Sequence, residues 1–222
     1  MKEAYIFDID DTLIKTDSHI YVYNHQNELI DKIDSRSYVK KRNMMKMYYE
    51  EGYQVNTDEF GGVGSCEVAD MLSYHHLTYG ETLKEQMEIL QNVALRAKER
   101  KEEKVIDIYF VTGRANQPET LQKLIQERFG LSIPVSHIYP VSNQICMKEL
   151  YTRLEECEVA RSILYNGKSD ANFKKRSFYD ILRKEYDYVE FYDDDLDNIL
   201  CFENVVKALN PKLKHKTFWI QD

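Results

Sequence analysis

The sequence predicts an α/β protein: a three-layer α/β/α sandwich around a mostly parallel sheet, with a cap or flap insertion. Strand-length apolar runs alternate with helical patterns through most of the chain, which is typical of parallel sheets covered by helices. Three of these runs end in polar clusters, at 8–12, 112–114 and 193–194. Because the carboxyl ends of parallel strands share one edge of a sheet, we expect the three clusters to converge there.

The first expected strand covers 4–9, where an apolar run leads directly to Asp8. The segment 17–80 follows and shows only short alternating pieces, a basic run and a glycine cluster. About a hundred residues separate the first two polar clusters, more than a helix and two turns require. We therefore expect 17–80 to be a cap or extended flap of hairpin, short helices and loops, inserted into a core formed by 1–16 and 81–222.

The remaining elements follow in order. Apolar residues recur at helical spacing through 81–104, so we expect a helix there. The β-branched and aromatic run at 105–111 predicts a buried parallel strand. Pro118 suits a first helical turn and Gly130 a helix end, which predicts a helix over 119–129. We further expect strands over 137–141, 188–192 and 217–220, and helices over 149–164, 177–184 and 199–209.

Composition narrows the class of protein. With 222 residues the chain can form one sizeable core and a small accessory lobe. The net charge of −8 disfavours a general binder of nucleic acids or membrane surfaces. No segment approaches the roughly 20 apolar residues that span a bilayer, so we expect no membrane partner. The four cysteines are far apart, which favours reduced thiols in a cytoplasmic protein over a zinc site or a disulfide framework.

The stretch Tyr-Ile-Phe-Asp-Ile-Asp-Asp-Thr-Leu carries the clearest chemical signal. The period of a strand places Asp8, Asp10 and Thr12 on one face. Two carboxylates so close together repel each other unless a cation lies between them, and Mg²⁺ accepts such ligands together with substrate phosphate oxygens. The pattern indicates phosphoryl transfer through an aspartyl phosphate. The plainer alternative is a strand end that breaks into a polar turn.

Taken in order, the polar clusters resemble the motifs of the haloacid dehalogenase (HAD)-like hydrolase superfamily, whose core is Rossmann-like. The first motif is similar to 7–13, the second to Thr112 in Val-Thr-Gly-Arg, and the fourth to Asp193-Asp194. Lys174 or Lys175 matches the third motif, a lysine that opens a helix. The resemblance covers the expected core, about two-thirds of the chain.

The second half is also similar to the 3′-phosphatase domains of phage polynucleotide kinases. Asp170, Lys174 and the pair Asp193-Asp194 follow the pattern of those domains, which favours Lys174 over Lys175. Small phage-encoded phosphatases of the superfamily are similar in layout, including a polar insertion before the second motif.

The resemblance implies a role for each matched residue. Asp8 would be the nucleophile and Asp10 the general acid and base. Thr112 would hydrogen-bond a phosphoryl oxygen, and Lys174 would neutralise charge on the nucleophile and the transferring group. The implied cofactor is Mg²⁺, with ligands drawn from Asp8, Asp10 through its backbone carbonyl, Asp193 and Asp194.

Substrate contacts are expected from the same strand ends, at Thr12, Gly113 and Arg114. Arg114 could clamp a second anionic group of the substrate, because a guanidinium matches phosphate oxygens, or it could be a surface arginine. Lys174 could instead be a solvated charge in a basic run. Asp195 and Asp197 could be further metal ligands, or could cap the helix that follows.

The leading hypothesis is a Mg²⁺-dependent phosphomonoester hydrolase whose partner is a small phosphorylated substrate. A narrower version is a 3′-phosphatase acting on a nucleotide or a nucleic-acid end. A different class is a non-catalytic relative that binds a phosphorylated ligand or a partner protein. The carboxylate at Asp10 discriminates between these classes, because a binding protein has no need of an acid/base group. The oligomeric state stays open.

Overall fold

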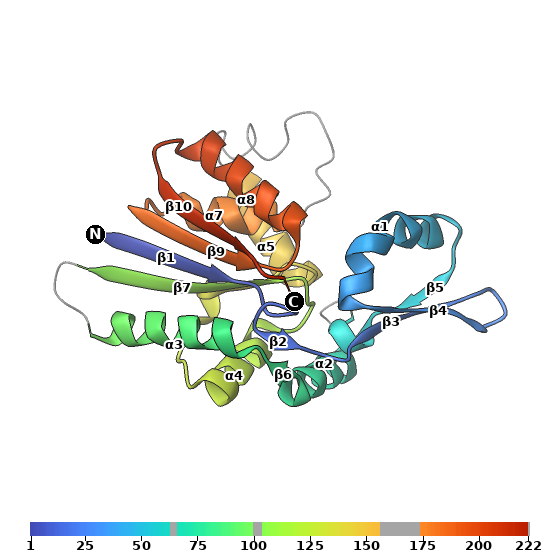
Figure 1. Ribbon diagram of the computed structural model, residues 1–222. Helices are drawn as coiled ribbons and strands as arrows, with labels where there is room; N and C mark the ends of the chain where they lie inside the picture. The colour runs from blue at the N-terminus through green and yellow to red at the C-terminus, as the bar shows by residue number, and fades with distance from the viewer. Residues whose placement is uncertain (63–65, 100–103, 156–173, 222) are drawn as a thin grey trace.

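A computed structural model describes residues 1–62, 66–99, 104–155 and 174–221. Its centre is a five-stranded sheet in the order β10-β9-β1-β7-β8 (Figure 1). All of its pairings are parallel. The strands are β1 (Lys2–Phe7), β7 (Val105–Thr112), β8 (Ile138–Pro140), β9 (Tyr188–Asp193) and β10 (Lys214–Trp219). The prediction of an α/β fold with a parallel sheet is confirmed.

Strand β1 lies at the point where the topology changes direction. From β1 the chain adds β7 and β8 on one side, then returns to place β9 and β10 on the other. In register, Phe7 of β1 lies between Phe110 and Tyr192. A crevice at the carboxyl ends of the strands, next to such a switch point, is the usual ligand site of open α/β sheets. The residue that follows Phe7 is Asp8.

Helices cover both faces of the sheet (Figure 1). On one face, α3 (Lys84–Lys98) and α4 (Pro118–Phe129) pack against alternate residues of β1, including Tyr5 and Phe7. On the other face, α5 (Gln144–Glu155), α7 (Lys175–Leu182) and α8 (Leu196–Leu209) pack against Ala4 and Ile6. Because both faces of β1 are buried, the strand reads as a continuous apolar run. The result is a three-layer α/β/α sandwich.

The segment between β1 and α3 is an insertion in the sandwich, and its expected role as a cap or flap stays a prediction. It contains β3 (His19–Tyr23), β4 (Leu29–Asp34), α1 (Ser35–Glu50), β5 (Gln54–Asn56), the 3₁₀ helix η1 (Asp58–Phe60) and α2 (Glu67–Tyr79). Strands β4-β3-β5 form an antiparallel sheet with a small apolar core of its own. At the base of the insertion, β2 (Ile14–Lys15) pairs with β6 (Glu81–Thr82). In Figure 1 α1 and β3–β5 project beyond the sandwich, whereas α2 lies beside α4.

The expected elements of the core are present, with shifted ends. Helix α4 has Pro118 in its first turn and Gly130 in the left-handed conformation at its end, as the sequence indicates. Helix α8 begins at Leu196 instead of 199, because Asp195 accepts a hydrogen bond from the backbone N–H of Asp197 and caps the helix. Helix α5 begins at Gln144, five residues before the helix predicted over 149–164. The end of that predicted helix, and Asp170, lie outside the described residues.

None of the helices within the described ranges combines the length and the apolar character that crossing a bilayer requires.

Candidate active site at the carboxyl edge of the sheet

Three aspartates meet beside the topological switch point. Asp8 follows β1, Asp193 ends β9, and Asp194 comes next in the chain. One carboxylate oxygen from each lies within 4.8 Å of the others. Asp8 and Asp193 are buried, and Asp194 is partly exposed. The sequence places these residues at strand ends, and the parallel pairing of β1 with β9 brings them together.

Lys174 lies between two of these carboxylates. Its Nζ donates to Oδ1 of Asp8 over 2.7 Å and to Oδ2 of Asp193 over 2.8 Å. The lysine is 5 % exposed, immediately before α7. The alternative that Lys174 is a solvated charge in a basic run is therefore wrong, and Lys174 is the lysine that hydrogen-bonds the aspartates. Removing an ammonium group from water costs several kcal/mol unless opposite charges surround it, as they do here.

The site carries more negative charge than Lys174 can balance. Burial, opposed by Lys174 and reinforced by Asp193 and Asp194, holds the pKa of Asp8 well above its usual range. Burial and the charge of Asp193 raise the pKa of Asp194 to about 8. For Lys174, burial alone would lower the pKa, but the carboxylates of Asp193 and Asp8 outweigh it and the pKa is raised. Three carboxylates thus share one ammonium group.

These residues fit a divalent cation. Mg²⁺ requires hard oxygen ligands in a compact arrangement, and Asp8, Asp193 and Asp194 supply carboxylate oxygens at suitable mutual distances. The surplus of negative charge, expressed in the raised pKa values, is what a divalent ion would neutralise. Asp10 contributes no side-chain oxygen to this group. That its backbone carbonyl would be a ligand stays a prediction.

The side chain of Asp10 is held by Arg114. The guanidinium Nε lies 3.1 Å from Oδ1 and 3.0 Å from Oδ2, and Nη2 lies 2.7 Å from Oδ1. The Arg114 side chain is completely buried, while that of Asp10 is 14 % exposed. The clamp hypothesis requires a guanidinium that is open to a substrate, whereas the guanidinium of Arg114 is buried among protein groups. Arg114 is not a surface arginine either. It fixes the orientation of Asp10.

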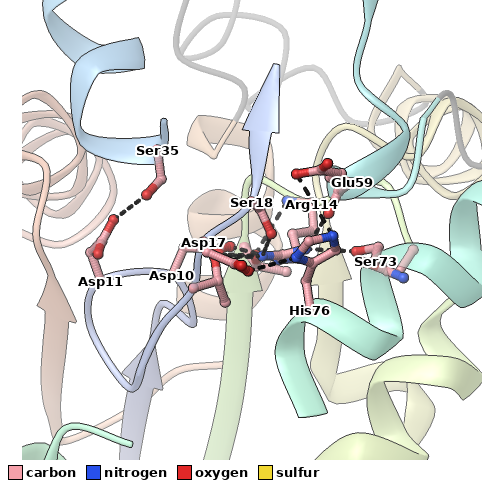
Figure 2. Close-up of polar contacts among 12 residues, drawn as sticks. Asp10, Asp11, Asp17, Ser18, Ser35, Glu59, Ser73, His76 and Arg114 are labelled. Atoms are coloured by element: carbon pink, nitrogen blue, oxygen red, sulfur yellow. Dashed lines mark hydrogen bonds and ion pairs between the residues drawn. The ribbon is translucent and has the colours of Figure 1, made fainter. Parts of the chain in front are cut away.

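Other donors and acceptors complete the cage around Arg114 (Figure 2). Nη1 donates to the backbone carbonyl of Glu59 over 2.8 Å and to Oγ of Ser73 over 2.7 Å. Nη2 also lies 3.1 Å from Oγ of Ser18. Ser18, Glu59 and Ser73 all belong to the insertion, so the insertion holds the residue that holds Asp10. The sequence contains no local signal for this cage, because its members are 41 to 96 positions from Arg114.

The insertion also contacts the loop after β7 directly. The backbone N–H of Ala115 donates to the carbonyl of Phe60 over 2.8 Å. Gly61 adopts a φ of +92°, and a Cβ at this position would lie 2.7 Å from the backbone nitrogen of Asn116. Only glycine allows so close an approach in that conformation. The guanidinium carbon of Arg114 lies over the ring of Phe60, 4.9 Å from the centre of that ring. These contacts fix η1 against the loop after β7.

The remaining predicted residues line the same edge. Thr112 is fully buried, and its Oγ1 accepts a hydrogen bond of 3.2 Å from the backbone N–H of Arg114. Gly113 is exposed, and a Cβ there would meet no atom within 4 Å. Thr12 is fully buried, and within the described part of the chain its Oγ1 has no hydrogen-bond partner. A buried hydroxyl without a partner is unfavourable, so Thr12 is a polar group that a ligand could satisfy.

The turn after β1 points its side chains in different directions. Asp11 has a positive φ of 52°, and its carboxylate accepts a short hydrogen bond from the Ser35 hydroxyl in the first turn of α1 (Figure 2). Asp11 therefore contacts the insertion, whereas Asp8 and Asp10 contact Lys174 and Arg114. The left-handed backbone conformation of Asp11 turns its carboxylate away from those of Asp8 and Asp10, so the three carboxylates contact different partners.

Asn198 is a part of the site that sequence reasoning missed. Its Nδ2 donates to Oδ1 of Asp193 over 3.0 Å, and the backbone N–H of Asp195 donates to the same oxygen over 2.9 Å. With Lys174 on Oδ2, both oxygens of Asp193 are therefore oriented. Asp195 caps α8 and Asp197 lies in its first turn, which supports the capping alternative for this acidic run. Asn198 follows Asp193 by five residues. This spacing does not by itself indicate a contact, because the contact depends on where α8 begins.

Comparison of the chain with protein-family models, with curated proteins and with solved structures gave no match.

Proposed function

We propose that this protein is a Mg²⁺-dependent phosphomonoester hydrolase that acts through an aspartyl phosphate on Asp8. The observation that supports the proposal best is the bridge of Lys174 between Asp8 and Asp193, with Asp10 held by Arg114 at the same edge. A nucleophilic carboxylate, a fixed cation beside it and a second, separately oriented carboxylate are the parts that phosphoryl transfer to an aspartate requires.

In the first step an oxygen of Asp8 attacks phosphorus, and the bond between phosphorus and the leaving-group oxygen breaks. The leaving alkoxide takes a proton from Asp10. Lys174 offsets negative charge on Asp8 and on the transferring group, because its ammonium lies 2.7 Å from the Asp8 carboxylate. The hydroxyl of Thr112 donates to a phosphoryl oxygen. A bound Mg²⁺ would neutralise charge on the phosphoryl oxygens.

In the second step water attacks the phosphorus of the aspartyl phosphate and gives a proton to Asp10. The bond between phosphorus and Asp8 breaks, and inorganic phosphate leaves. The proton that Asp10 gives in the first step is thus returned to it in the second. Arg114 holds the carboxylate of Asp10 in place for both proton transfers, and proton transfer by a positioned side chain contributes about 10²–10⁴-fold to rate.

The proposal is tested by phosphate release from p-nitrophenyl phosphate and glycerol 2-phosphate, with Mg²⁺ and with a chelator. We expect turnover that requires both the metal and Asp8. Asp8→Asn should lower kcat by about 10³-fold or more, because it removes the nucleophile. Glu88→Gln, which changes an exposed carboxylate of α3 in the same way, is the matched control and should keep full activity.

Trapping of the intermediate separates this mechanism from direct attack by water. Acid quenching of the Asp10→Asn variant with radiolabelled substrate should leave label on the protein, since breakdown lacks its base, and Asp8→Asn should leave none. Folded protein that binds Mg²⁺ and phosphate but neither turns over nor becomes labelled would contradict the proposal. It would favour the non-catalytic phospho-ligand binder instead.

A further inference from the structure

Exposed apolar residues follow the aspartate cluster along α8 and lie beside it on β10. Trp219, the last residue of β10, is 48 % exposed, and Leu196 and Leu200, one turn apart on α8, are 42 % and 49 % exposed. Isolated exposed apolar residues are common, but a half-exposed tryptophan at the rim of a candidate active site is informative. The chain contains a single tryptophan.

Trp219 is fixed from several directions. Its indole Nε1 donates to the backbone carbonyl of Asp194 over 2.9 Å. Its backbone pairs in register with Asp193, and the N–H of the next residue, Ile220, donates to the carbonyl of Asp193 over 2.9 Å. The side chain is thus anchored to the two residues that we assign to the metal, while about half of it stays open to solvent. An anchored aromatic ring loses little conformational entropy when a ligand stacks on it.

The position of Trp219 suits the body of a substrate. Strand β10 lies two places from β1 in the sheet, about 10 Å at the usual strand spacing. The phosphoryl group of an ester bound at Asp8 would lie at the same carboxyl edge, so a ring carried by that ester would be within reach of Trp219. Apolar walls with a few well-placed polar groups are typical of small-molecule sites. Here the polar groups would bind the phosphate, and the indole would bind a ring.

We infer that Trp219 is a specificity-determining residue that stacks on a planar ring, such as a nucleobase, in the phosphomonoester substrate. The inference deepens the proposed function and rests on it. The net charge of −8 favours a mononucleotide or similar small ester over a long nucleic acid, because a polyanion would be repelled. Stacking does not depend on which base is present, so Trp219 would select esters that carry a planar ring without distinguishing one base from another.

The first test compares kcat/KM for adenosine monophosphate, as its 3′ and 5′ isomers, with that for glycerol 2-phosphate. We expect the wild type to prefer the nucleotide. In Trp219→Ala the ratio of the two kcat/KM values should fall by about 5- to 150-fold, the usual range for loss of one stacked base. Trp219→Phe should keep most of the preference. Tyr79→Ala, which removes an exposed aromatic ring of α2, is the control and should leave the ratio unchanged.

The second test uses the fluorescence of Trp219, which has no background from other tryptophans. Adenosine monophosphate added to Asp8→Asn protein with Mg²⁺ should quench the emission saturably, and inorganic phosphate or glycerol 2-phosphate should not. This readout does not require turnover.

The outcomes of the two tests are distinguishable. If the wild type hydrolyses both esters but Trp219→Ala leaves their ratio unchanged, the inference is overturned and the phosphatase stands. If no ester is hydrolysed, the proposed function fails, and the quenching experiment decides the inference alone. Saturable quenching by the nucleotide then supports a ring-binding site at Trp219, and its absence overturns it.

Discussion

Arg114 binds Asp10 along one edge of its guanidinium, with Nη2 2.7 Å and Nε 3.1 Å from the same carboxylate oxygen. The two residues are 104 positions apart in the sequence, and the arginine is completely buried. A planar guanidinium restricts both the position and the rotation of the carboxylate, which a lysine ammonium does not. Arg114 therefore sets the orientation of Asp10, the proposed acid/base group, although it lies outside the sequence motif that contains Asp10.

Substitution of Arg114 by lysine should lower kcat more than it raises KM. The charge remains, but the fixed geometry is lost, and we expect about a 10- to 100-fold fall in kcat. Steady-state kinetics on p-nitrophenyl phosphate give the two parameters separately. Arg183→Lys, a partly exposed arginine that pairs with Asp180, is the control. An Arg114→Lys variant with unchanged kcat would mean that Arg114 stabilises the fold without positioning Asp10.

Asp70 is expected to be important for stability. This buried residue of α2 accepts hydrogen bonds from the side chains of Asn116 and Thr120 and from the backbone N–H of Gln117, at the start of α4. It satisfies a helix N-terminus that has no side-chain cap of its own. Asp70→Ala should lower the free energy of unfolding by about 1–3 kcal/mol, as measured by urea denaturation.

Glu67→Ala, which removes an exposed acidic residue of the same helix, should change the free energy of unfolding by less than about 0.5 kcal/mol. Equal effects of the two substitutions would show that α2 does not depend on its polar contacts with α4.

Mg²⁺ should raise the melting temperature. A ligand that binds only the folded protein stabilises it by about 2.7 kcal/mol at one hundred times its Kd. Scanning calorimetry with and without Mg²⁺ measures the shift, and Asp194→Asn should reduce it because a ligand oxygen loses its charge. Glu88→Gln should show the full shift. A shift of equal size in Asp194→Asn would place the ion elsewhere.

Glu3 should make stability depend on pH in the acid range. This buried residue of β1 pairs with Lys104 and Arg96. Burial alone would raise the pKa of Glu3, but hydrogen bonds from Lys104 and Tyr5 and the charges of Lys104 and Arg96 lower it overall. Because the pKa is lower in the folded protein, the stabilisation is present above the unfolded value, about 4.3, and is lost as the pH falls through the folded value.

Glu3→Gln should therefore lower the free energy of unfolding at pH 7, by about 1–3 kcal/mol, and the difference from wild type should shrink below about pH 4. Urea denaturation at both pH values measures this. A difference that stays constant would assign the effect of Glu3 to packing instead of charge.

The convergence of Asp8, Asp193 and Thr112 could be predicted, because parallel strands carry their carboxyl ends to one edge whatever the connections are. The placement of Lys174 beside them followed only from resemblance, and the structure adds the two contacts that explain its burial. The position of Arg114 could not be predicted. Its partners come from the turn after β1, the loop before β3, η1 and α2, and no local pattern specifies how the insertion folds back onto the core.

The pairing of Ile14 with Thr82 has a consequence for how such a protein can diversify. The chain leaves the sandwich and returns to it at neighbouring points, so the segment between them can change in length without displacing the core strands. The contacts to Arg114 come from both ends of that segment, at Ser18 and between Glu59 and Ser73. The middle, β3 to β5 with α1, has its own apolar core. It is the part that evolution or an engineer could exchange while Asp10 and Arg114 keep their positions.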